Sequence, residues 1–500
     1  MNNFNLISAY IATIIILIIT IGIGAVLYLY FSGYISQLTS ETEEATTIKS
    51  IIECSQARID GYAYRITLKD FNYRIPINIT ERSGNDLIDY QVLITLDTAS
   101  LISQGKMRND CGDIRFTDSD GSTLLNYWVE SGCNSANTRI WVKVPNIPAN
   151  SNKTIYLYYG NSEATSLSNV KDVFIREIDG LVLHLTFDEG EGTIAYDSSG
   201  NDNHGTLING PIWIDGVYGN ALSFDGVDDF VQINDSPTLN PTNDGFTISF
   251  WINLNRYVNP GAIIAKRVDP NNGYFVFIWS GGYMFFDWGG YTGANRWNTS
   301  FVPELNRWYF IVLIQNASGR YLYVDGNLFS FTTNKGSTTL ASTNAPLRIS
   351  ADSVSARYFN DGMTDEVRLY SRDLTPEEIS DLYNNYGYSS PNYPGKTLVR
   401  KYVSPEPTVS LGNEETSPII KLTMINLGVD LGKRYLIKLI YEDGKIAVRN
   451  ITLDKNLSSG ESKEIYLTDL PKGIIRKIEI YSIDVCPNML VGIRSVNIEV

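Results

Sequence analysis

A long apolar stretch near the amino terminus limits where the rest of this chain can fold. Residues Leu6 to Phe31 carry no charged side chain, and Met1 to Ser8 contains neither Lys nor Arg. As an α-helix this stretch would be about 39 Å long, whereas the hydrocarbon core of a bilayer is about 30 Å thick. A cleavable secretory signal would have a shorter apolar segment and a basic start. We therefore predict a single-pass membrane anchor and stalk in residues 1–50, with the remaining chain outside the cell.

Charge and composition narrow the classes of partner and chemistry. The chain has 40 Lys and Arg against 55 Asp and Glu, a net charge of −15. This balance repels a phosphate backbone, so we expect no nucleic-acid partner. Two histidines, His184 and His204, are too few for a multi-histidine metal cage and disfavour Ser-His or Cys-His catalysis. The aromatic fraction of 12% favours a sheet-rich fold.

The apolar stretch also carries a family resemblance. Ser8 to Thr20 (SAYIATIIILIIT) resembles the amino-terminal helix of archaeal type IV pilins and archaellins. In that family the helix follows a short basic leader, is trimmed by a prepilin peptidase and packs into a filament core. The basic leader is missing here. The resemblance implies an archaeal surface protein and, as an alternative to a simple anchor, a homopolymeric surface filament.

Four cysteines indicate an extracytoplasmic protein. Cys54, Cys111, Cys133 and Cys486 allow three pairings. We favour Cys111–Cys133, which encloses a short segment, and Cys54–Cys486, which joins the two ends of the chain. The absence of a CxxC spacing argues against a zinc knuckle or a thioredoxin-like motif.

Apolar and polar residues alternate after the stalk, as in half-buried strands. The segments concerned include YRIPINI, DYQVLITLD, DIRFTDSDG, LNYWVES and TRIWVKVPNIPANSNKTIYLYYGN. In this order they resemble a domain family of unknown function that is common in prokaryotic surface proteins and often precedes a laminin-G-like jelly roll. We assign residues 71–175 to this all-β domain.

Residues 178–390 resemble that laminin-G-like (concanavalin A-like) jelly roll. The segments that carry the resemblance are LHLTFDEG, DSSGNDNHG, YGNALSFDG, FTISFWI, YLYVDG and DEVRLYSR, followed by a short helix at Pro376 to Ile379. The resemblance implies two packed antiparallel sheets.

The last hundred residues also read as strands. Ile419 to Leu427, Tyr435 to Tyr441 and Ile474 to Tyr481 are rich in β-branched and aromatic residues, and we predict an immunoglobulin-like sandwich over 396–500. If Cys54 reaches Cys486, residues 51–70 pair with this sandwich and the two central domains are an insertion into it. The predicted fold class is therefore mainly β: a transmembrane or pilin-like helix followed by antiparallel sandwiches.

A structural calcium ion is the main chemical candidate. In laminin-G-like domains a calcium ion often lies where the first and last strands meet. The resemblance places Asp188 and Asp365 there, with Asn201 to Asn203, and Asn203 in particular, completing the ligands. The alternative is that both aspartates end strands and accept hydrogen bonds from turn amides.

Aromatic residues suggest a second candidate site. Trp288, Tyr291 and Trp297 lie in a Gly-rich run (GGYMFFDWGGYTGANRW), and aromatic rings stack on sugars. We name these three residues as a candidate ligand-binding face, although alternating residues of a sandwich strand usually lie in the core, which is the interpretation we favour.

Catalysis has little support. Jelly-roll glucanases carry paired carboxylates on one strand, but neither E-x-D-x-E nor E-x-D-x-x-E occurs, and Glu189 and Glu191 lie in a Gly-rich turn. We predict a non-enzymatic, membrane-anchored archaeal surface protein, an adhesin or pilin-like subunit, whose modules bind glycans or proteins. The alternative is an anchored polysaccharide-processing enzyme on the jelly-roll scaffold.

Overall fold

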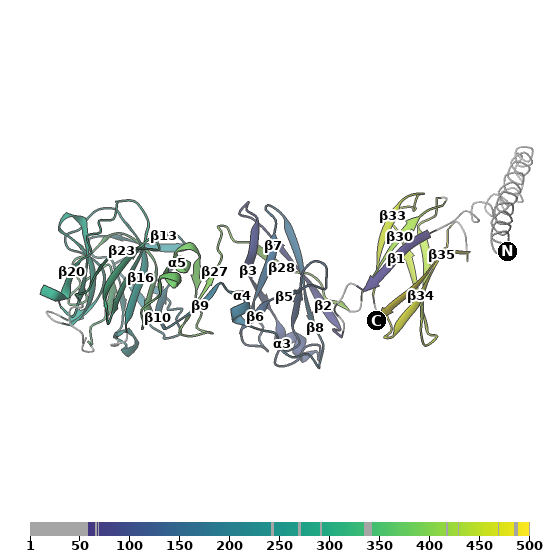
Figure 1. The fold of residues 1–500 in the computed structure, drawn as a ribbon, viewed down its shortest axis with the longest axis horizontal. Helices are drawn as coiled ribbons and strands as arrows, with labels where there is room; N and C mark the ends of the chain where they lie inside the picture. The colour runs from purple at the N-terminus through teal and green to yellow at the C-terminus, as the bar shows by residue number, and fades with distance from the viewer. Residues whose placement is uncertain are drawn as a thin grey trace, which may run out of the picture. The chain divides into compact units, whose positions relative to one another are not determined.

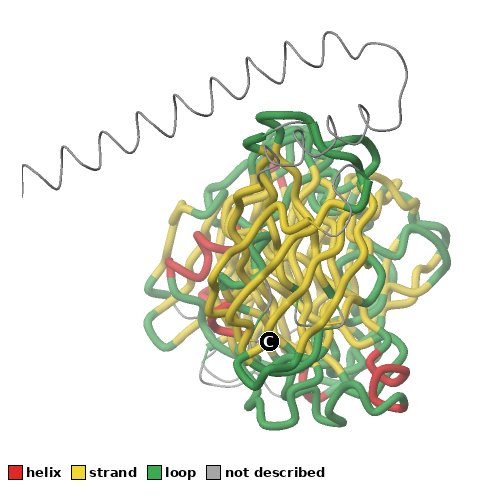
Figure 2. Tube along the Cα trace, turned by 90° about the vertical axis from the view of Figure 1, so that its right-hand side faces the viewer, coloured by secondary structure: helices red, strands yellow, loops and turns green. Residues whose placement is uncertain are grey.

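The computed structural model describes residues 59–499, apart from 66–67, 69, 242–244, 269–271, 291–292, 335–342, 417–418, 429, 469 and 485–488. The chain divides into two compact units. We call Met1–Arg74 with Glu415–Val500 the terminal unit, and Ile75–Glu414 the central unit. Antiparallel strands dominate both (Figures 1 and 2), which confirms the mainly β fold class.

The terminal unit is a two-sheet sandwich. One sheet has the order β1-β30-β33 and the other β32-β31-β34-β35. Their bounds are β1 Ile59–Arg65, β30 Ile420–Asn426, β31 Arg434–Tyr441, β32 Ile446–Thr452, β33 Ser462–Leu467, β34 Ile474–Ser482 and β35 Met489–Glu499; β29 Glu415–Thr416 pairs with Tyr73 and Arg74. Leu422, Ile437 and Ile478, from both sheets, share one core. The segment expected to pair with the carboxy-terminal domain does so here through β1, since Ile59–Arg65 runs antiparallel to β30.

The first module of the central unit contains two sheets. One has the order β3-β7-β6, and β28-β2-β8-β4-β5 lie in the other. Their bounds are β2 Tyr73–Thr80, β3 Leu87–Leu96, β4 Arg115–Thr117, β5 Leu124–Leu125, β6 Tyr127–Ser131, β7 Thr138–Ile147, β8 Asn152–Tyr159 and β28 Thr408–Leu411, with short helices α3 Thr98–Ser103 and α4 Val170–Val173. The predicted Cys111–Cys133 disulfide is present and lies within this module.

The second module is a jelly roll of two eight-stranded sheets. One sheet holds β10 Leu181–Leu185, β13 Ile212–Asp215, β14 Asn220–Asp225, β16 Phe246–Leu254, β21 Tyr309–Asn316, β22 Gly319–Val324, β23 Asn327–Thr332 and β25 Asp361–Tyr370. The other holds β11 Ile194–Ala195, β12 Gly205–Ile208, β15 Phe230–Ile233, β17 Gly261–Val268, β18 Asn272–Trp279, β19 Tyr283–Trp288, β20 Arg296–Asn298 and β24 Leu347–Ile349. Residues from both sheets, such as Ile248 and Val276, form its core.

Strand β16 shows why this sequence forms a layered structure. All nine of its residues are buried, so the strand must be covered on both faces. Phe250 belongs to the core between the sheets, whereas Trp251 packs with Ile379 of helix α5 Pro376–Asn384 on the outer face. A capping box between Thr375 and Glu378 starts that helix.

A small sheet joins the two modules. It has the order β26-β27-β9, with bounds β26 Tyr386–Tyr388, β27 Lys396–Arg400 and β9 Arg176–Asp179. In β27, Leu398 packs into the cluster around Trp141 of the first module, and Val399 packs into the outer jelly-roll cluster. Residues 396–414 therefore belong to the central unit, which differs from the predicted start of the last domain at 396. The reason is that β27 buries one face against each module.

Several predictions fall outside the described residues. They concern the apolar stretch at 6–31, the pilin-like segment and the Cys54–Cys486 pair. Across the part of the chain that the structure describes, no helix has the length and apolar character needed to cross a membrane.

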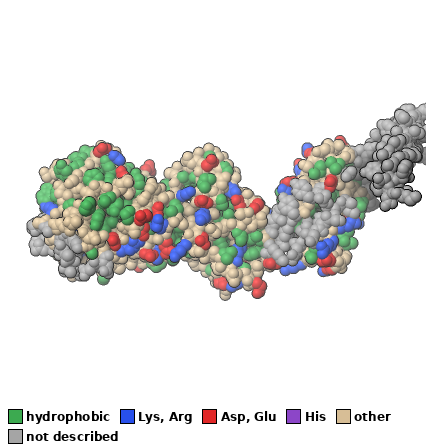
Figure 3. All heavy atoms as spheres, in the orientation of Figure 1, with side chains coloured by type: hydrophobic (Ala, Val, Ile, Leu, Met, Phe, Trp, Pro, Cys, Tyr) green, Lys and Arg blue, Asp and Glu red, His purple; other side chains and the backbone are tan. Residues whose placement is uncertain are grey.

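Acidic and basic side chains are interspersed on the face shown in Figure 3. Two ion pairs of the central unit involve helix α5. Arg176 pairs with Asp381, and Arg372 donates two hydrogen bonds to Glu378 at 2.8 and 2.6 Å.

Candidate functional site

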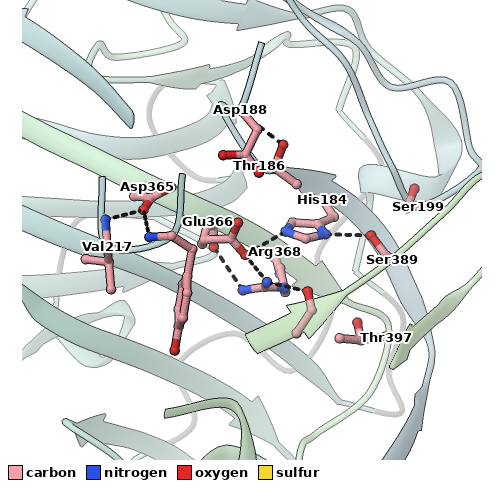
Figure 4. Close-up of polar contacts among 12 residues, drawn as sticks. His184, Thr186, Asp188, Ser199, Val217, Asp365, Glu366, Arg368, Ser389 and Thr397 are labelled. Atoms are coloured by element: carbon pink, nitrogen blue, oxygen red, sulfur yellow. Dashed lines mark hydrogen bonds and ion pairs between the residues drawn. The ribbon is translucent and has the colours of Figure 1, made fainter. Parts of the chain in front are cut away.

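Three carboxyl groups lie close together at one end of the jelly roll (Figure 4). Asp365 and Glu366 are neighbours in β25, and Asp188 follows β10, which pairs with β25. Both β25 carboxyl groups are completely buried. The structure thus brings the two predicted aspartates into one electrostatic group, with Glu366 as a third member.

A β-bulge explains why two successive acids are buried together. Ser249 of β16 pairs with Arg368 and Trp251 pairs with Asp365, so β25 has one residue more than β16 over this interval. Glu366 has a φ of +55°. A bulge interrupts the alternation of side chains along a strand, so neighbouring residues need not point to opposite faces.

Asp365 is held by a tight turn of the jelly roll. Its Oδ2 accepts hydrogen bonds from the amides of Val217 and Tyr218 at 2.8 and 3.2 Å, while its buried Oδ1 has no partner among the described residues. At Gly216 in this turn, a Cβ would lie 2.6 Å from Oδ2. A glycine is therefore required for the turn to reach the carboxylate.

Glu366 is also paired on one side only. Its Oε2 accepts hydrogen bonds from Arg368 and, at 3.0 Å, from Nε2 of His184. The buried Oε1 has no partner in the described part of the chain. Burial lowers the pKa of His184 well below its usual value, which keeps the ring neutral, and its Nδ1 lies 2.5 Å from Oγ of Ser389.

The carboxyl groups resist ionisation together. Burial and the neighbouring Glu366 raise the pKa of Asp188 to about 7. Burial raises the pKa of Glu366 to about 7, and burial with the Glu366 charge raises that of Asp365 well above its ordinary value. Asp188 itself is exposed at the surface. Its Oδ1 accepts a hydrogen bond from the backbone amide of Asn220 at 2.9 Å.

This donor set has the chemistry of a hard-cation site. Two buried carboxylate oxygens lack donors, and calcium prefers oxygen ligands. Among the described residues, however, only Asp225, Asp228 and Asp229 bring three acidic ligand atoms within 4.8 Å of one another. The ligand atoms of Asp188, Asp365 and Glu366 do not all lie within this distance of one another. These side chains would therefore have to move to bind one ion together.

The third predicted ligand, Asn203, is elsewhere engaged. Its side-chain amide donates to the carbonyl of Val182 at 2.9 Å and to Thr238 at 3.0 Å. Its backbone amide donates to Asp197. Glu366 is the third acidic side chain beside the two aspartates, and both aspartates make the turn contacts that the alternative interpretation expected.

The candidate aromatic binding face is not supported at Trp288 and Trp297, which lie in the core as the favoured interpretation expected. Trp288 and Trp297 are 4% and 9% exposed and belong to the core between the sheets. The ring of Trp288 lies 5.8 Å from that of Phe246. Strand β19 turns its even-numbered residues inward, so Trp288 cannot present a ring face to a ligand. Tyr291 lies outside the described residues.

A cavity of about 490 Å³ lies between the first module and the jelly roll. Its walls come from strands β3 and β7, from Asp188 after β10, from the Tyr218–Asn220 turn and from the returning segment 386–409. The aromatic residues lining it are Tyr90, Trp141, Tyr218, Tyr386, Tyr388 and Tyr402. The sequence analysis singled out none of them. The density of tyrosines over 383–402 (Tyr383, Tyr386, Tyr388, Tyr393 and Tyr402) is the only local signal that could have drawn attention to this segment.

Two ion-pair networks hold the cavity walls. Arg400 donates to both oxygens of Glu406 at 2.7 and 2.8 Å, and the Tyr90 hydroxyl donates to Glu406 at 2.9 Å. The second network includes two other lining residues, Arg139 and Trp141, which both donate hydrogen bonds to Glu130.

Comparisons with known proteins identify the two modules. Residues 225–380 match the family model described as the Concanavalin A-like lectin/glucanases superfamily, and residues 110–194 match the Domain of unknown function (DUF2341). One curated relative, botulinum neurotoxin type C from Clostridium botulinum C phage, is 29% identical over 106 residues, which are 20% of this chain and 8% of the toxin.

Solved structures are more distant. Domain 4 of AbnA, an extracellular arabinanase from Geobacillus stearothermophilus determined with arabinotriose, has 20% identity and a TM-score of 0.34, covering 41% of this chain and 98% of that domain. The binding domain of Paraclostridial Mosquitocidal Protein 1 has 16% identity and a TM-score of 0.34, covering 61% and 75%. These similarities are too distant to assign a ligand. The family models identify residues 225–380 as a concanavalin A-like domain and residues 110–194 as part of a domain family of unknown function, as the sequence predicted.

Proposed function

We propose that this chain is a membrane-anchored cell-surface protein whose β modules bind carbohydrate or protein ligands outside the cell. The observation that carries the proposal is the Cys111–Cys133 disulfide, because disulfides persist mainly in oxidising, extracytoplasmic surroundings. The uncharged stretch from Leu6 to Phe31 supports the anchor. Its likeness to archaeal pilins supports an archaeal source.

Protease treatment of intact cells tests this topology. We expect added protease to remove the body of the protein while a short amino-terminal fragment stays with the membrane. A carboxy terminus that remains protected until the cells are lysed would contradict the proposal. Amino-terminal sequencing of the membrane fragment, together with electron microscopy of surface filaments, separates a simple anchor from a processed, pilin-like subunit.

Ligand binding without catalysis is supported by the cavity between the modules. Asp188 and Glu406 are carboxylates in its wall, and glycoside hydrolysis generally needs two available carboxyl groups. Both oxygens of Glu406 are occupied by Arg400, which assigns Glu406 a supporting role. Release of sugars from polysaccharides incubated with the full chain would instead favour the anchored enzyme.

We also propose that the jelly roll holds one structural calcium ion near Asp365, Glu366 and Asp188. The two buried oxygens without donors, Asp365 Oδ1 and Glu366 Oε1, support this site. A divalent cation would supply the positive charge that three crowded carboxylates lack. The ion would thereby link the β10 end, the Gly216 turn and β25.

A further inference from the structure

The cavity between the first module and the jelly roll belongs to neither module alone. Tyr90 and Trp141 come from the first module, Tyr218 from the jelly roll, and Tyr402 from the segment that returns between them. Of the three carboxylates proposed to bind calcium, Asp188 lines this cavity, whereas Asp365 and Glu366 are not among its lining residues. The cavity volume of about 490 Å³ falls within the ~300–1,000 Å³ typical of small-molecule sites.

Aromatic rings line the wall of the cavity and leave its interior open. The ring of Tyr218 lies 5.0 Å from that of Tyr386 and 5.1 Å from that of Tyr402, and Trp141 lies 5.0 Å from Tyr388. Tyr218, Tyr388 and Tyr402 are only half-buried. Rings held in this way present apolar faces against which the C–H face of a sugar ring can stack.

The polar groups of the wall favour a neutral ligand. Arg400 is paired with Glu406, and Arg139 with Glu130, so neither guanidinium carries an uncompensated charge toward the cavity. A phosphate or another strong anion would find no unpaired cation among the described residues that line the cavity. The Nε of Arg400 also has no acceptor among the described residues; it is shielded from solvent, so a saccharide hydroxyl reaches it only after the neighbouring rings shift. Asp188 and Asn220 add polar groups on the jelly-roll side.

We propose that this cavity binds a neutral saccharide of one or two rings, stacked on the half-buried tyrosines and hydrogen-bonded to the polar wall. Stacking surface combined with paired charges and a donor in need of an oxygen matches a polyhydroxylated, uncharged ligand. The assignment rests on the proposed ligand-binding function and names its site and ligand class.

The test uses the full-length chain in detergent on an array of neutral and uronate-containing mono- and disaccharides, followed by titration with the sugar that binds best. We expect a neutral sugar to bind. Tyr402→Ala should weaken binding about tenfold through loss of ring stacking, whereas Tyr402→Phe should retain it. Val409→Trp, which adds a ring to the cavity wall, should also weaken binding. Tyr283→Ala is the matched control, because Tyr283 is an exposed tyrosine at the start of β19 that does not line the cavity.

Each contrary outcome overturns a different statement. If a sugar binds with equal affinity to the wild type, Tyr402→Ala and Val409→Trp, all with unchanged melting curves, the cavity is not the site, although the ligand-binding function stands. Binding confined to uronates would refute the neutral class. If no sugar on the array binds, the saccharide assignment fails, while the surface location is still decided separately by protease treatment of cells.

Discussion

Two buried glutamates in the central unit have opposite environments. Glu130 of the first module accepts hydrogen bonds at both oxygens, from Arg139 at 3.1 Å and Trp141 at 2.8 Å on one side and from Tyr388 at 2.8 Å on the other. Burial tends to raise the pKa of Glu130, but Ser390, Arg139, Tyr388 and Trp141 together lower it below its ordinary value. Glu366 of the jelly roll, equally buried, leaves one oxygen without a donor, and its pKa is raised to about 7.

The difference teaches that burial alone does not give a carboxylate its role. A buried carboxylate with donors on every side is stabilised in its charged form and fastens the structure. A buried carboxylate that lacks donors is costly when ionised and is suited to a cation. By this criterion Glu130 joins the first module to Tyr388 of the returning segment, whereas the donor-free oxygen of Glu366 supports the proposed calcium site.

Loss of Glu130 should give the largest effect. Glu130→Ala leaves the half-buried guanidinium of Arg139 without its carboxylate partner and the Trp141 and Tyr388 donors without their acceptor. We therefore expect the free energy of unfolding of the central unit to fall by about 4 kcal/mol. Glu366→Ala, measured in EDTA, should cost clearly less, because the unfavourable charge is removed with the side chain. Urea unfolding of the full chain measures both. If both variants lost the same free energy of unfolding, the two glutamates would not differ in the way that their environments predict.

The first module should depend next on its disulfide. Replacing both Cys111 and Cys133 by Ser opens a loop with a sequence separation of 22 residues, for which the chain-entropy model gives about 3 kcal/mol. We expect the same loss with calcium and with EDTA, because the disulfide and the β25 carboxylates lie in different modules. A loss that changes with calcium would show that the two modules are coupled.

The jelly roll should depend instead on calcium. At a hundredfold excess over its Kd, a ligand that binds only the folded state stabilises it by about 2.7 kcal/mol. The melting temperature of the full chain should therefore fall when calcium is replaced by EDTA, and Asp365→Asn should abolish most of that difference. Glu304→Gln is the matched control, because Glu304 is an exposed carboxylate of the jelly roll that belongs to neither acidic group. Identical wild-type curves in calcium and EDTA would refute the site.

Acid should weaken the Glu130 network with a smaller effect. A carboxyl group whose folded pKa is lowered stabilises the fold above its ordinary pKa of 4.5, and this contribution is lost as the pH falls toward the lowered value. The stability difference between wild type and Glu130→Gln should therefore shrink by about 1 kcal/mol from pH 5 to pH 3. The groups facing Glu130, namely Arg139, Trp141, Tyr388 and Ser390, do not titrate in this range. A difference that grows with acid would contradict the assignment.

Local sequence patterns predicted where the strands lie, but not which face of each strand is buried in the core. Period-two alternation located Tyr73–Thr80, and the segment FTISFWI lies within β16. The same alternation in Tyr283–Trp288 could not distinguish a binding face from a core face, since both have the same period. The tertiary packing of β19 against Phe246 and Tyr274 decided it.

By itself, the sequence determined the module order, the Cys111–Cys133 pair and, through the family resemblance, the proximity of Asp188 and Asp365. Each of these depends on residues close together in the chain or on a motif that recurs in order. Only the tertiary structure added Glu366, because a bulge in β25 overrides the strand alternation that would place it opposite Asp365. The cavity, too, was decided only by tertiary structure. Tyr90 and Glu406 are 316 residues apart, and no local pattern encodes a contact that forms only when β27 packs against both modules.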